Sequence, residues 1–426
     1  MDFSQIELIY RAEGNANLVV AIPQYKKVLR LPKANISTKS SSSTATSSSR
    51  SLSCDLKGLA NTRIPSSEQQ EDILNPADNL AYTKLLGTLI GSEYIYVPDS
   101  VAIISQTDSE KISSICRPFR PAHRRDKKIC GQFGYILPDA TLLPDNLCAN
   151  IQLLPTTNTF AIEIKPKQGW KLTETVNSNL IDLRNSGKCR YCAMQFSKLK
   201  NCKISALSSY CPLDLFSGIQ SRMETAIHAL LRCPQNNLRI FENGNLIYGD
   251  HSGSLLFTDL QGRGSLFEKN FKTMVEIVRK ALLTNYIHSE ETTSFDERSC
   301  VLETILKIQQ LAEENFAFMS KRSYEDCKSY QVVRNILRKN ITTLDDLLPE
   351  ERYSLSATLM DCSIIITFHE MALEKKEDDF KNSHFIKTED GSTFLTKVTI
   401  VDLDAKPDNH FRKYVNTTNE AYASIS

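Results

Sequence analysis

The chain has 426 residues, of which 41% are hydrophobic and 24% are charged, and its net charge is +1. This composition is typical of a folded globular protein, and the protein as a whole is not a polycation, so any anion binding must come from local clusters. The length predicts two or three domains, or one large two-lobed domain. Twelve cysteines without a recognisable secretory signal predict free thiols in the cytoplasm or nucleus. No apolar run reaches the length of a membrane span, so no membrane segment is expected.

The first third of the chain is rich in strand patterns. Short apolar runs containing Val, Ile and Leu predict strands at residues 6–11, 17–22 and 27–31. A Ser- and Thr-rich segment, residues 37–53, cannot bury apolar area and predicts a disordered insertion. Helical periodicity follows over residues 73–90, and further strands are expected at residues 94–104 and 134–137.

The remainder is richer in helices. Periodicity predicts helices at residues 218–231, 266–287, 300–319 and 330–339. Asn243-Gly244 lies between two short apolar runs and predicts a hairpin. Strands at residues 362–368 and 393–403 are expected to pair, and the charged residues 373–390 predict a loop. The sum is an α+β fold with two lobes and a cleft between them: a smaller, mostly β lobe (1–148) and a larger α+β lobe (149–426).

The segment Glu163-Ile164-Lys165-Pro166-Lys167 carries the clearest chemical signal. It ends an apolar strand that starts at Phe160. Lys165 and Lys167 lie two residues apart, so they point the same way in extended backbone, and Glu163 is in register with them. Cations for phosphate beside an acid for metal or nucleotide are typical of phosphotransfer. By spacing alone, a strand end with solvated lysines explains the pattern equally well.

Two other clusters allow more than one interpretation. A basic run, stiffened by Pro118 and Pro121, comprises Arg117, Arg120, His123, Arg124, Arg125, Lys127 and Lys128. Such runs are often solvated loops or nucleic-acid tails, but the prolines argue against a floppy tail, and we do not favour nucleic acid as the partner.

Cysteines at metal-ligand spacing form the second cluster. Cys189 and Cys192 lie three apart, with Cys202 and Cys211 downstream, so a zinc site is one interpretation. The other is a helix over residues 189–200 whose cysteines are small buried hydrophobic residues, and we favour that one over zinc.

The sequence Glu-Ile-Lys-Pro-Lys followed by glycine resembles the signature of inositol-pentakisphosphate 2-kinases. The segment Val401-Asp402-Leu403-Asp404-Ala405-Lys406-Pro407 is a second specific match, and weaker matches run from residue 6 to about residue 414. The resemblance implies an enzyme whose cofactors are ATP and Mg²⁺, and we expect the protein to be a monomer. It would transfer the γ-phosphate of ATP to the 2-hydroxyl of inositol 1,3,4,5,6-pentakisphosphate and so make inositol hexakisphosphate.

The resemblance also implies residues for nucleotide and metal. The nucleotide set is Glu13, Gly14, Asn17, Arg30, Asp139, Glu163 and Asp402. Asp402, at the end of a strand, is the expected magnesium ligand, with Asn237 as a second ligand. The family's turn reads Gly-Glu-Gly-x-x-Asn, and Ala12 replaces its first glycine here.

The catalytic residues implied by the resemblance are Asp361, as the base for the attacking hydroxyl, and Lys165, as a bridge between ATP and substrate phosphates. Without the resemblance, Asp361 reads as a helix-end or turn aspartate. The implied substrate set is Arg120, Lys165, Lys167, Lys198, Asn236, Arg239, Lys406, His410 and Tyr414. His410 stands where a relative has arginine. Five phosphate monoesters carry a charge of roughly −8 to −10, so several cations are needed to admit the ligand.

Two alternatives remain at this point. An inactive kinase-like module could hold inositol phosphates or RNA on the same basic residues, although all the candidate catalytic residue types are present. A protein kinase is a weaker alternative, because the chain lacks a His-Arg-Asp loop and an Asp-Phe-Gly segment.

Overall fold

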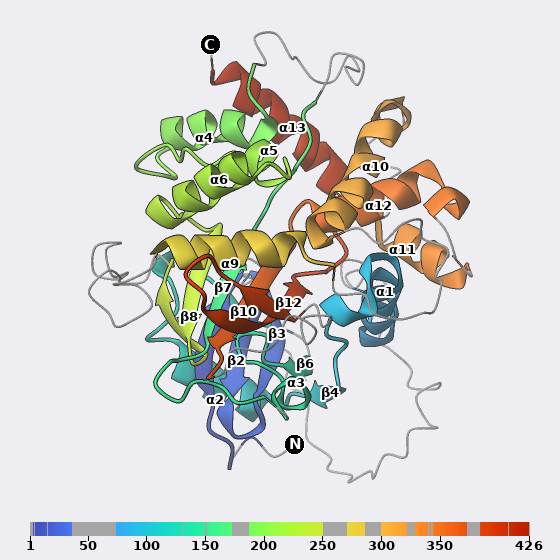
Figure 1. Ribbon diagram of the computed structural model, residues 1–426. Coiled ribbons are helices and arrows are strands. Elements are labelled where there is room, and N and C mark those ends of the chain that lie inside the picture. Colours follow the sequence, from blue (N-terminus) through green and yellow to red (C-terminus); the bar gives the residue numbers. More distant parts are fainter. Residues whose placement is uncertain are drawn as a thin grey trace, which may run out of the picture.

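The computed structural model describes residues 3, 5–14, 16–35, 74–130, 132–149, 151–172, 187–249, 271–285, 300–321, 329–339, 341, 344–372, 384–407 and 409–425. In this part of the chain the fold has two antiparallel six-stranded sheets covered by helices (Figure 1). The predicted α+β class is therefore confirmed. The insertion predicted at residues 37–53 lies outside the described residues.

The first sheet is built from the N-terminal segments. Its strands are β1 (Ile9–Glu13), β2 (Asn17–Ile22), β3 (Lys27–Asn35), β4 (Ser100–Ile103), β5 (Lys127–Ile129) and β6 (Phe133–Pro138), in the order β1-β2-β3-β6-β4 with β5 paired to the end of β3. The predicted strands are recovered with two shifts. The first begins at Ile9 rather than at residue 6. The strand expected at residues 94–104 shrinks to β4, because Tyr94 ends a 3-10 turn and Pro98 has no N–H for a ladder.

The second sheet has the order β11-β12-β10-β7-β8-β9. Its strands are β7 (Phe160–Ile164), β8 (Leu238–Glu242), β9 (Asn245–Tyr248), β10 (Ser363–Glu370), β11 (Phe385–Lys387) and β12 (Thr393–Val401). The predicted hairpin and the predicted pairing of the last two long strands are both confirmed. The loop expected over residues 373–390 is wrong where β11 extends the sheet beside β12. All five residues of β7 are buried, because β7 is central and paired on both sides.

Helices pack against both sheets. They are α1 (Pro76–Ile90), α2 (Gln106–Cys116), α3 (Asp145–Cys148), α4 (Arg190–Lys200), α5 (Pro212–Leu215), α6 (Gln220–Arg232), α9 (Phe271–Leu283), α10 (Val301–Lys321), α11 (Ser329–Arg338), α12 (Pro349–Leu359) and α13 (His410–Ala423). Of these, α2 packs against the first sheet, and α1, α6, α9, α10 and α11 pack against the second. Single 3-10 turns lie at Pro23–Tyr25, Ser92–Tyr94, Ala122–Arg124 and Leu344–Asp346. Among these helices, none combines the length and the apolar character required to cross a bilayer.

Sequence reasoning missed three helices of ten or more residues. α2 starts with a capping box between Ser105 and Asp108, and this pair of residues is a sequence signal for the start of a helix. α12 begins with Pro349 at its first turn, yet it is buried on nearly every side and so has no amphipathic stripe to find. α13 buries Phe411, which packs edge-on to Tyr353 of α12.

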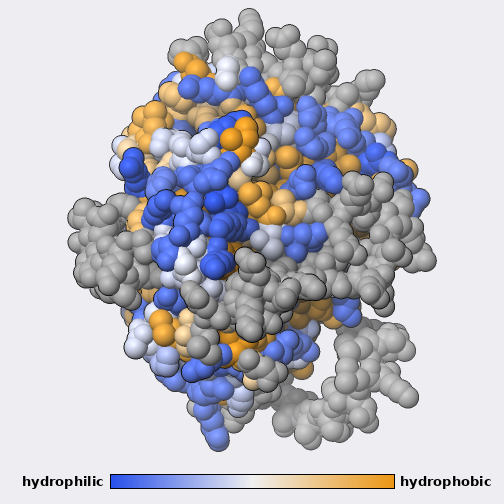
Figure 2. Space-filling model, in the orientation of Figure 1, coloured by the Kyte–Doolittle hydropathy of each residue, from blue (hydrophilic) through white to orange (hydrophobic). Residues whose placement is uncertain are grey.

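The apolar interior falls into separate cores. The largest lies between the second sheet and α1, α6, α9, α10 and α11. Another joins α10, α12, α13 and Trp170, and a third lies between the first sheet and α2. α1 therefore packs with the second sheet although it precedes β4 in the chain (Figure 1). On the face seen in Figure 2, hydrophilic residues gather over α6 and α9, and hydrophobic residues form small separate areas.

The turn that follows β7 depends on a glycine. A Cβ at Gly169 would lie 2.4 Å from the Phe216 ring, whereas a Cβ at Gly187 would meet nothing within 4 Å. We predict that Gly169→Ala lowers the free energy of unfolding by about 1–3 kcal/mol, because the ring must move to accept the methyl group. Urea unfolding measures this change, with Gly187→Ala as the control. Equal stability of the two variants would contradict the close approach.

Candidate active site

Three lysines and two aspartates meet at one edge of the second sheet. Lys165 Nζ lies 2.6 Å from Asp402 Oδ2, Lys167 Nζ lies 3.0 Å from Asp361 Oδ1, and Lys406 Nζ lies 3.2 Å from Asp361 Oδ2. The sheet itself explains the convergence. β7 and β12 both end at this edge, and β10 begins there between them, because β10 is antiparallel to both neighbours. Lys165 and Asp402, which are 237 positions apart in the chain, are thereby brought into contact.

The backbone is strained at two of these residues. Lys167 has a φ of 63° and Asp402 a φ of 61°, in the left-handed region that side chains other than glycine seldom adopt. Each such residue costs on the order of 1–3 kcal/mol and persists only where its surroundings enforce it. Strain of this kind concentrates at functional sites, so both residues are candidates for a functional role.

The aspartates are held as anions. Loss of water contacts favours the protonated form of Asp361, but the charges of Lys167, Lys406 and Lys165 outweigh it and hold the pKa of Asp361 far below its usual range. The pKa of Asp402 is lowered in the same way against burial, chiefly by Lys165 and Arg30. The Asp361 side chain is 54% exposed while that of Lys167 is 20% exposed. The exposed carboxylate of Asp361 is therefore surrounded by lysine side chains that are mostly buried.

Lys198 lies close enough to Lys167 and Arg190 to feel their positive charge. Burial, and then the charges of Lys167 and Arg190, lower the pKa of Lys198 to about 8. Burial also lowers the pKa of Lys167, despite its contact with Asp361. These lysines repel one another and lack enough carboxylates to neutralise them. An anionic ligand would relieve that repulsion, so the cluster is prepared to bind one.

Asn237 and Asp402 fit a hard cation such as Mg²⁺. Asn237 Oδ1 is buried without a hydrogen-bond partner, while its Nδ2 donates to Tyr191 Oη at 2.9 Å. A buried carbonyl oxygen left without a donor is a costly arrangement unless something positive binds it. The backbone carbonyl of Asn237 accepts from the N–H of Lys165, which places Asn237 directly beside the lysine cluster. Magnesium prefers carboxylate and carbonyl oxygens, the groups that these two residues supply.

Glu163, on β7, is buried, and both of its carboxylate oxygens have partners. Its carboxylate accepts from Ser363 Oγ at 2.8 Å and pairs with Arg239 Nη1 at 2.9 Å. Burial raises its pKa, but Arg239 and Lys165 outweigh burial and lower it. Arg239 therefore anchors Glu163 in this structure, and its predicted contact with substrate stays a prediction.

An ion pair joins the first sheet to this site. Arg30, on β3, donates to both carboxylate oxygens of Asp404 and lies 3.6 Å from Asp402. Asn17, at the start of β2, donates to Asp404 at 2.8 Å. Two residues of the predicted nucleotide set thus bind Asp404, a residue to which sequence analysis gave no role, and Arg30 also approaches the predicted metal ligand Asp402.

Glu13 and Arg120 form an ion pair at the end of β1. Arg120 donates to Glu13 through Nε at 2.9 Å and Nη2 at 2.7 Å, and Lys33 also pairs with Glu13 and donates to the carbonyl of Gly14. Glu13 is fully buried. In this structure Arg120 pairs with Glu13 at the end of β1, and its predicted contact with substrate stays a prediction.

Four further predicted residues are also placed. Asp139 is buried against Arg11, so its side chain is structural. Asn236 is exposed beside Asn237. Tyr414 is buried and donates to Gln168 at 2.8 Å. His410 hydrogen-bonds to Tyr353, and burial, with Lys406 and Arg190, lowers its pKa to about 3. His410 is therefore uncharged at neutral pH and can offer a phosphate hydrogen bonding but no positive charge.

Gln309 is a site residue that sequence reasoning missed. It lies on α10, is fully buried, and accepts from the N–H of Gly169 at 2.8 Å. Its Nε2 donates to the carbonyls of Lys167 and Leu359, each at 2.9 Å. One amide therefore fixes both the strained lysine turn and the end of α12, which leads into Asp361. A glutamine on the apolar stripe of a helix was the only available signal.

Comparison with known proteins identifies the family of this chain. The family described as inositol-pentakisphosphate 2-kinase matches residues 10–420. The chain belongs to this family. The resemblance inferred from Glu-Ile-Lys-Pro-Lys and Val-Asp-Leu-Asp-x-Lys-Pro is therefore confirmed, and the match includes both sheets and the helices between them.

Three relatives named inositol-pentakisphosphate 2-kinase illustrate the similarity. The Drosophila melanogaster protein is 40% identical over 356 residues, which are 68% of this chain and 56% of that protein. The Danio rerio protein is 32% identical over 56% of this chain and 44% of its own length. The Arabidopsis thaliana protein is 28% identical over 95% of this chain and 90% of its own. The matched part thus spans about half of the first two relatives and most of the third.

The role of Gln309 in this family fold can be tested by truncation. We predict that Gln309→Ala lowers the free energy of unfolding by about 2 kcal/mol or more, because several buried backbone groups lose their partner at once. The measurement is urea unfolding. Gln310→Ala is the matched control, since its side chain is partly exposed on the same helix. A variant at 309 that is as stable as the one at 310 would rule out the bracing role.

Proposed function

We propose that this family member is an ATP- and Mg²⁺-dependent kinase that phosphorylates the 2-hydroxyl of inositol 1,3,4,5,6-pentakisphosphate. The observation that carries the proposal is one accessible carboxylate, Asp361, surrounded by the mostly buried cations Lys165, Lys167 and Lys406. A pentakisphosphate of charge roughly −8 to −10 requires such a cluster. The names of the relatives support the same substrate. The described cysteines are free, which suits the reducing cytoplasm or nucleus.

The nucleotide would lie between the two sheets, in a two-lobed kinase-like arrangement. Arg30 and Asn17 come from the first sheet and contact Asp404 at the edge of the second. Gly14 supports this placement. A Cβ there would meet nothing closer than 3.9 Å, so the fold itself does not require a glycine in this turn. The lack of a side chain would instead let backbone N–H groups approach a phosphate.

Magnesium would be held by Asp402 and Asn237, whose oxygens fit it as described above. When bound, the ion would neutralise charge on the β- and γ-phosphates of ATP. Lys165, which pairs with Asp402, would then be free to bridge nucleotide and substrate phosphates. Lys167, Lys198 and Lys406 would hold the inositol phosphates and orient the ring.

Asp361 would accept the proton of the attacking hydroxyl. In the ligand-free protein its pKa is too low for an effective base, because Lys167 and Lys406 pair with it. Substrate phosphates would draw both ammonium groups away and share their charge. The basicity of Asp361 would therefore rise once the substrate is in place, which confines proton abstraction to the loaded enzyme.

The direct test is to incubate the purified protein with ATP, Mg²⁺ and inositol pentakisphosphate and to detect inositol hexakisphosphate. We predict that Asp361→Asn reduces kcat by about 10²–10⁴-fold while inositol pentakisphosphate still binds, because the amide cannot accept the proton. The control is Asp345→Asn, at a side chain that is 98% exposed. An intact wild-type protein that makes no hexakisphosphate would refute the function. A protein that only binds the ligand would have no turnover for Asp361→Asn to remove.

The pKa of Lys198 gives a prediction about pH. In the free protein this lysine loses its proton around pH 8, but a bound phosphate would favour its charged form. Binding therefore requires proton uptake above that pH, and affinity should fall as pH rises. We expect the KM for inositol pentakisphosphate to increase about tenfold between roughly pH 7 and pH 9. In Lys198→Arg the increase should largely vanish, because arginine stays charged. The same slope in both proteins would contradict this assignment.

A further inference from the structure

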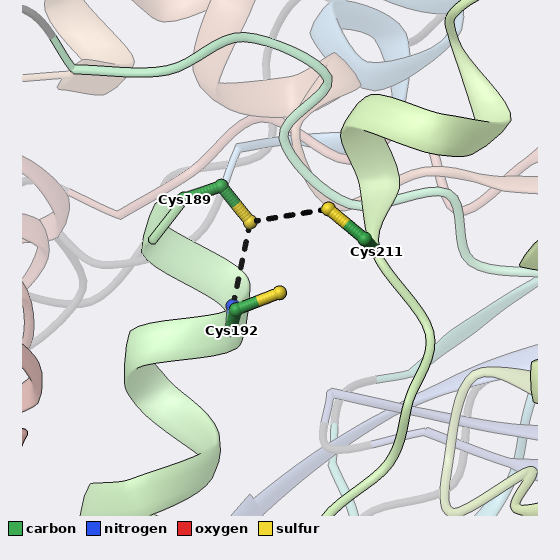
Figure 3. Close-up of side chains that lie close together, drawn as sticks. All are labelled: Cys189, Cys192 and Cys211. Atoms are coloured by element: carbon green, nitrogen blue, oxygen red, sulfur yellow. Dashed lines mark hydrogen bonds between the residues drawn. The ribbon is translucent and has the colours of Figure 1, made fainter. Parts of the chain in front are cut away.

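Three cysteine sulfurs lie together at the start of α4, outside the lysine cluster. They belong to Cys189, Cys192 and Cys211, and all three lie within 4.8 Å of one another. Figure 3 shows the side chains converging from two separate segments, the first turn of α4 and the residue before α5. Sequence spacing indicated a possible zinc site at Cys189 and Cys192, with Cys202 and Cys211 downstream. The fold brings Cys211 to the first two and leaves Cys202 outside the group.

The spacing of these sulfurs matches a metal site. Zinc bound by thiolates has Zn–S bonds of about 2.3 Å in a tetrahedron, which separates neighbouring sulfurs by about 3.8 Å. The Sγ atoms of Cys189 and Cys211 are 3.8 Å apart. A disulfide has an S–S bond of about 2.05 Å, so these two are not bonded to each other. Within the described residues the group has three members, which leaves a fourth position for a solvent molecule.

The surrounding backbone favours thiolates. Cys189 is the N-cap of α4, and the N–H of Cys192 points to its sulfur at 3.5 Å. Cys211 comes directly before the short helix α5, and its side chain makes no capping hydrogen bond there. N–H groups at helix starts stabilise the charge that sulfur carries when it binds a metal.

Ordinary core packing explains only part of this arrangement. Cys189 belongs to the main apolar core, and Cys192 and Cys211 are partly buried and pack against it, as small hydrophobic side chains often do. Apolar packing alone does not require the three sulfurs to face one another, as they do here (Figure 3). In a reducing compartment, clustered cysteines favour a metal over a disulfide.

We propose that Cys189, Cys192 and Cys211 form a structural zinc site that clips the start of α4 to the segment before α5. Each thiol releases its proton as its sulfur binds the ion. The clip has a consequence for the other site, because α4 also carries Lys198 near its C-terminal end. This consequence, unlike the metal site itself, rests on the proposed function. Loss of zinc should raise the KM for inositol pentakisphosphate more than the KM for ATP.

Metal content tests the site without any activity assay. The full chain is purified under reducing conditions without chelator, and zinc is measured by plasma mass spectrometry. We expect about one zinc per chain, lost in Cys211→Ser and Cys192→Ser and kept in Cys202→Ser and Cys233→Ser. If the triad variants fail to fold, the wild-type chain can be stripped with a chelator and titrated with Co²⁺. Thiolate-to-cobalt charge-transfer absorption supports the site.

Alkylation of the cysteines gives a second measurement on the wild-type chain. With zinc, the three cysteines should resist iodoacetamide, and chelation should expose them, while Cys202 reacts in both cases. Three outcomes would overturn the proposal: no bound metal and no cobalt signal, equal alkylation with and without zinc, or a Cys189–Cys211 disulfide in protein quenched with acid. None of these outcomes bears on whether the enzyme makes inositol hexakisphosphate, so the two proposals can fail separately.

Discussion

The balance between buried cations and a few carboxylates at one sheet edge is the constraint on which the rest of the site depends. Lys165, Lys167 and Lys406 are held by only two aspartates, and the charges of Lys167 and Arg190 act on Lys198 more strongly than that of Asp361. Such a cluster is stable enough to fold because each aspartate serves two cations. It remains under-neutralised, and the proposed polyanionic substrate would supply the missing charge. Binding of that substrate would relieve the repulsion between the lysines.

This charge cluster requires a rigid support, which comes from apolar and amide groups rather than from charges. β7 is buried along its whole length, so the position of Lys165 is fixed by the sheet. Lys167 is held in the left-handed region by the turn that packs Gly169 on Phe216, and Gln309 ties that turn to α12. A strained lysine that is braced in this way loses little conformational entropy when it binds a phosphate.

The sequence predicted local features well and spatial ones only where a resemblance supplied them. The strand ending in Glu-Ile-Lys-Pro-Lys and the hairpin at Asn243-Gly244 are local patterns, and both were recovered. Contacts such as Gln309 with Lys167, or Cys189 with Cys211, depend on which helix lies against which turn, and periodicity carries no such information. α12 escaped notice for a related reason, since a helix buried all round has no stripe. Arg120 shows what a matched motif leaves out. The motif suggested a role in substrate binding, but it did not predict that Arg120 pairs with Glu13.

Asp402 connects the two halves of the proposed reaction. In the ligand-free protein it pairs with Lys165 from the second sheet and lies near Arg30 from the first. In the proposed reaction Asp402 would hold magnesium, which would supply positive charge for the nucleotide phosphates. Arg30 also pairs with Asp404, so its link between the two sheets does not depend on Asp402 alone. Metal, nucleotide and inositol phosphate would then each favour binding of the others, because the positive charge of the metal and the lysines would be balanced by the negative charge of the phosphates.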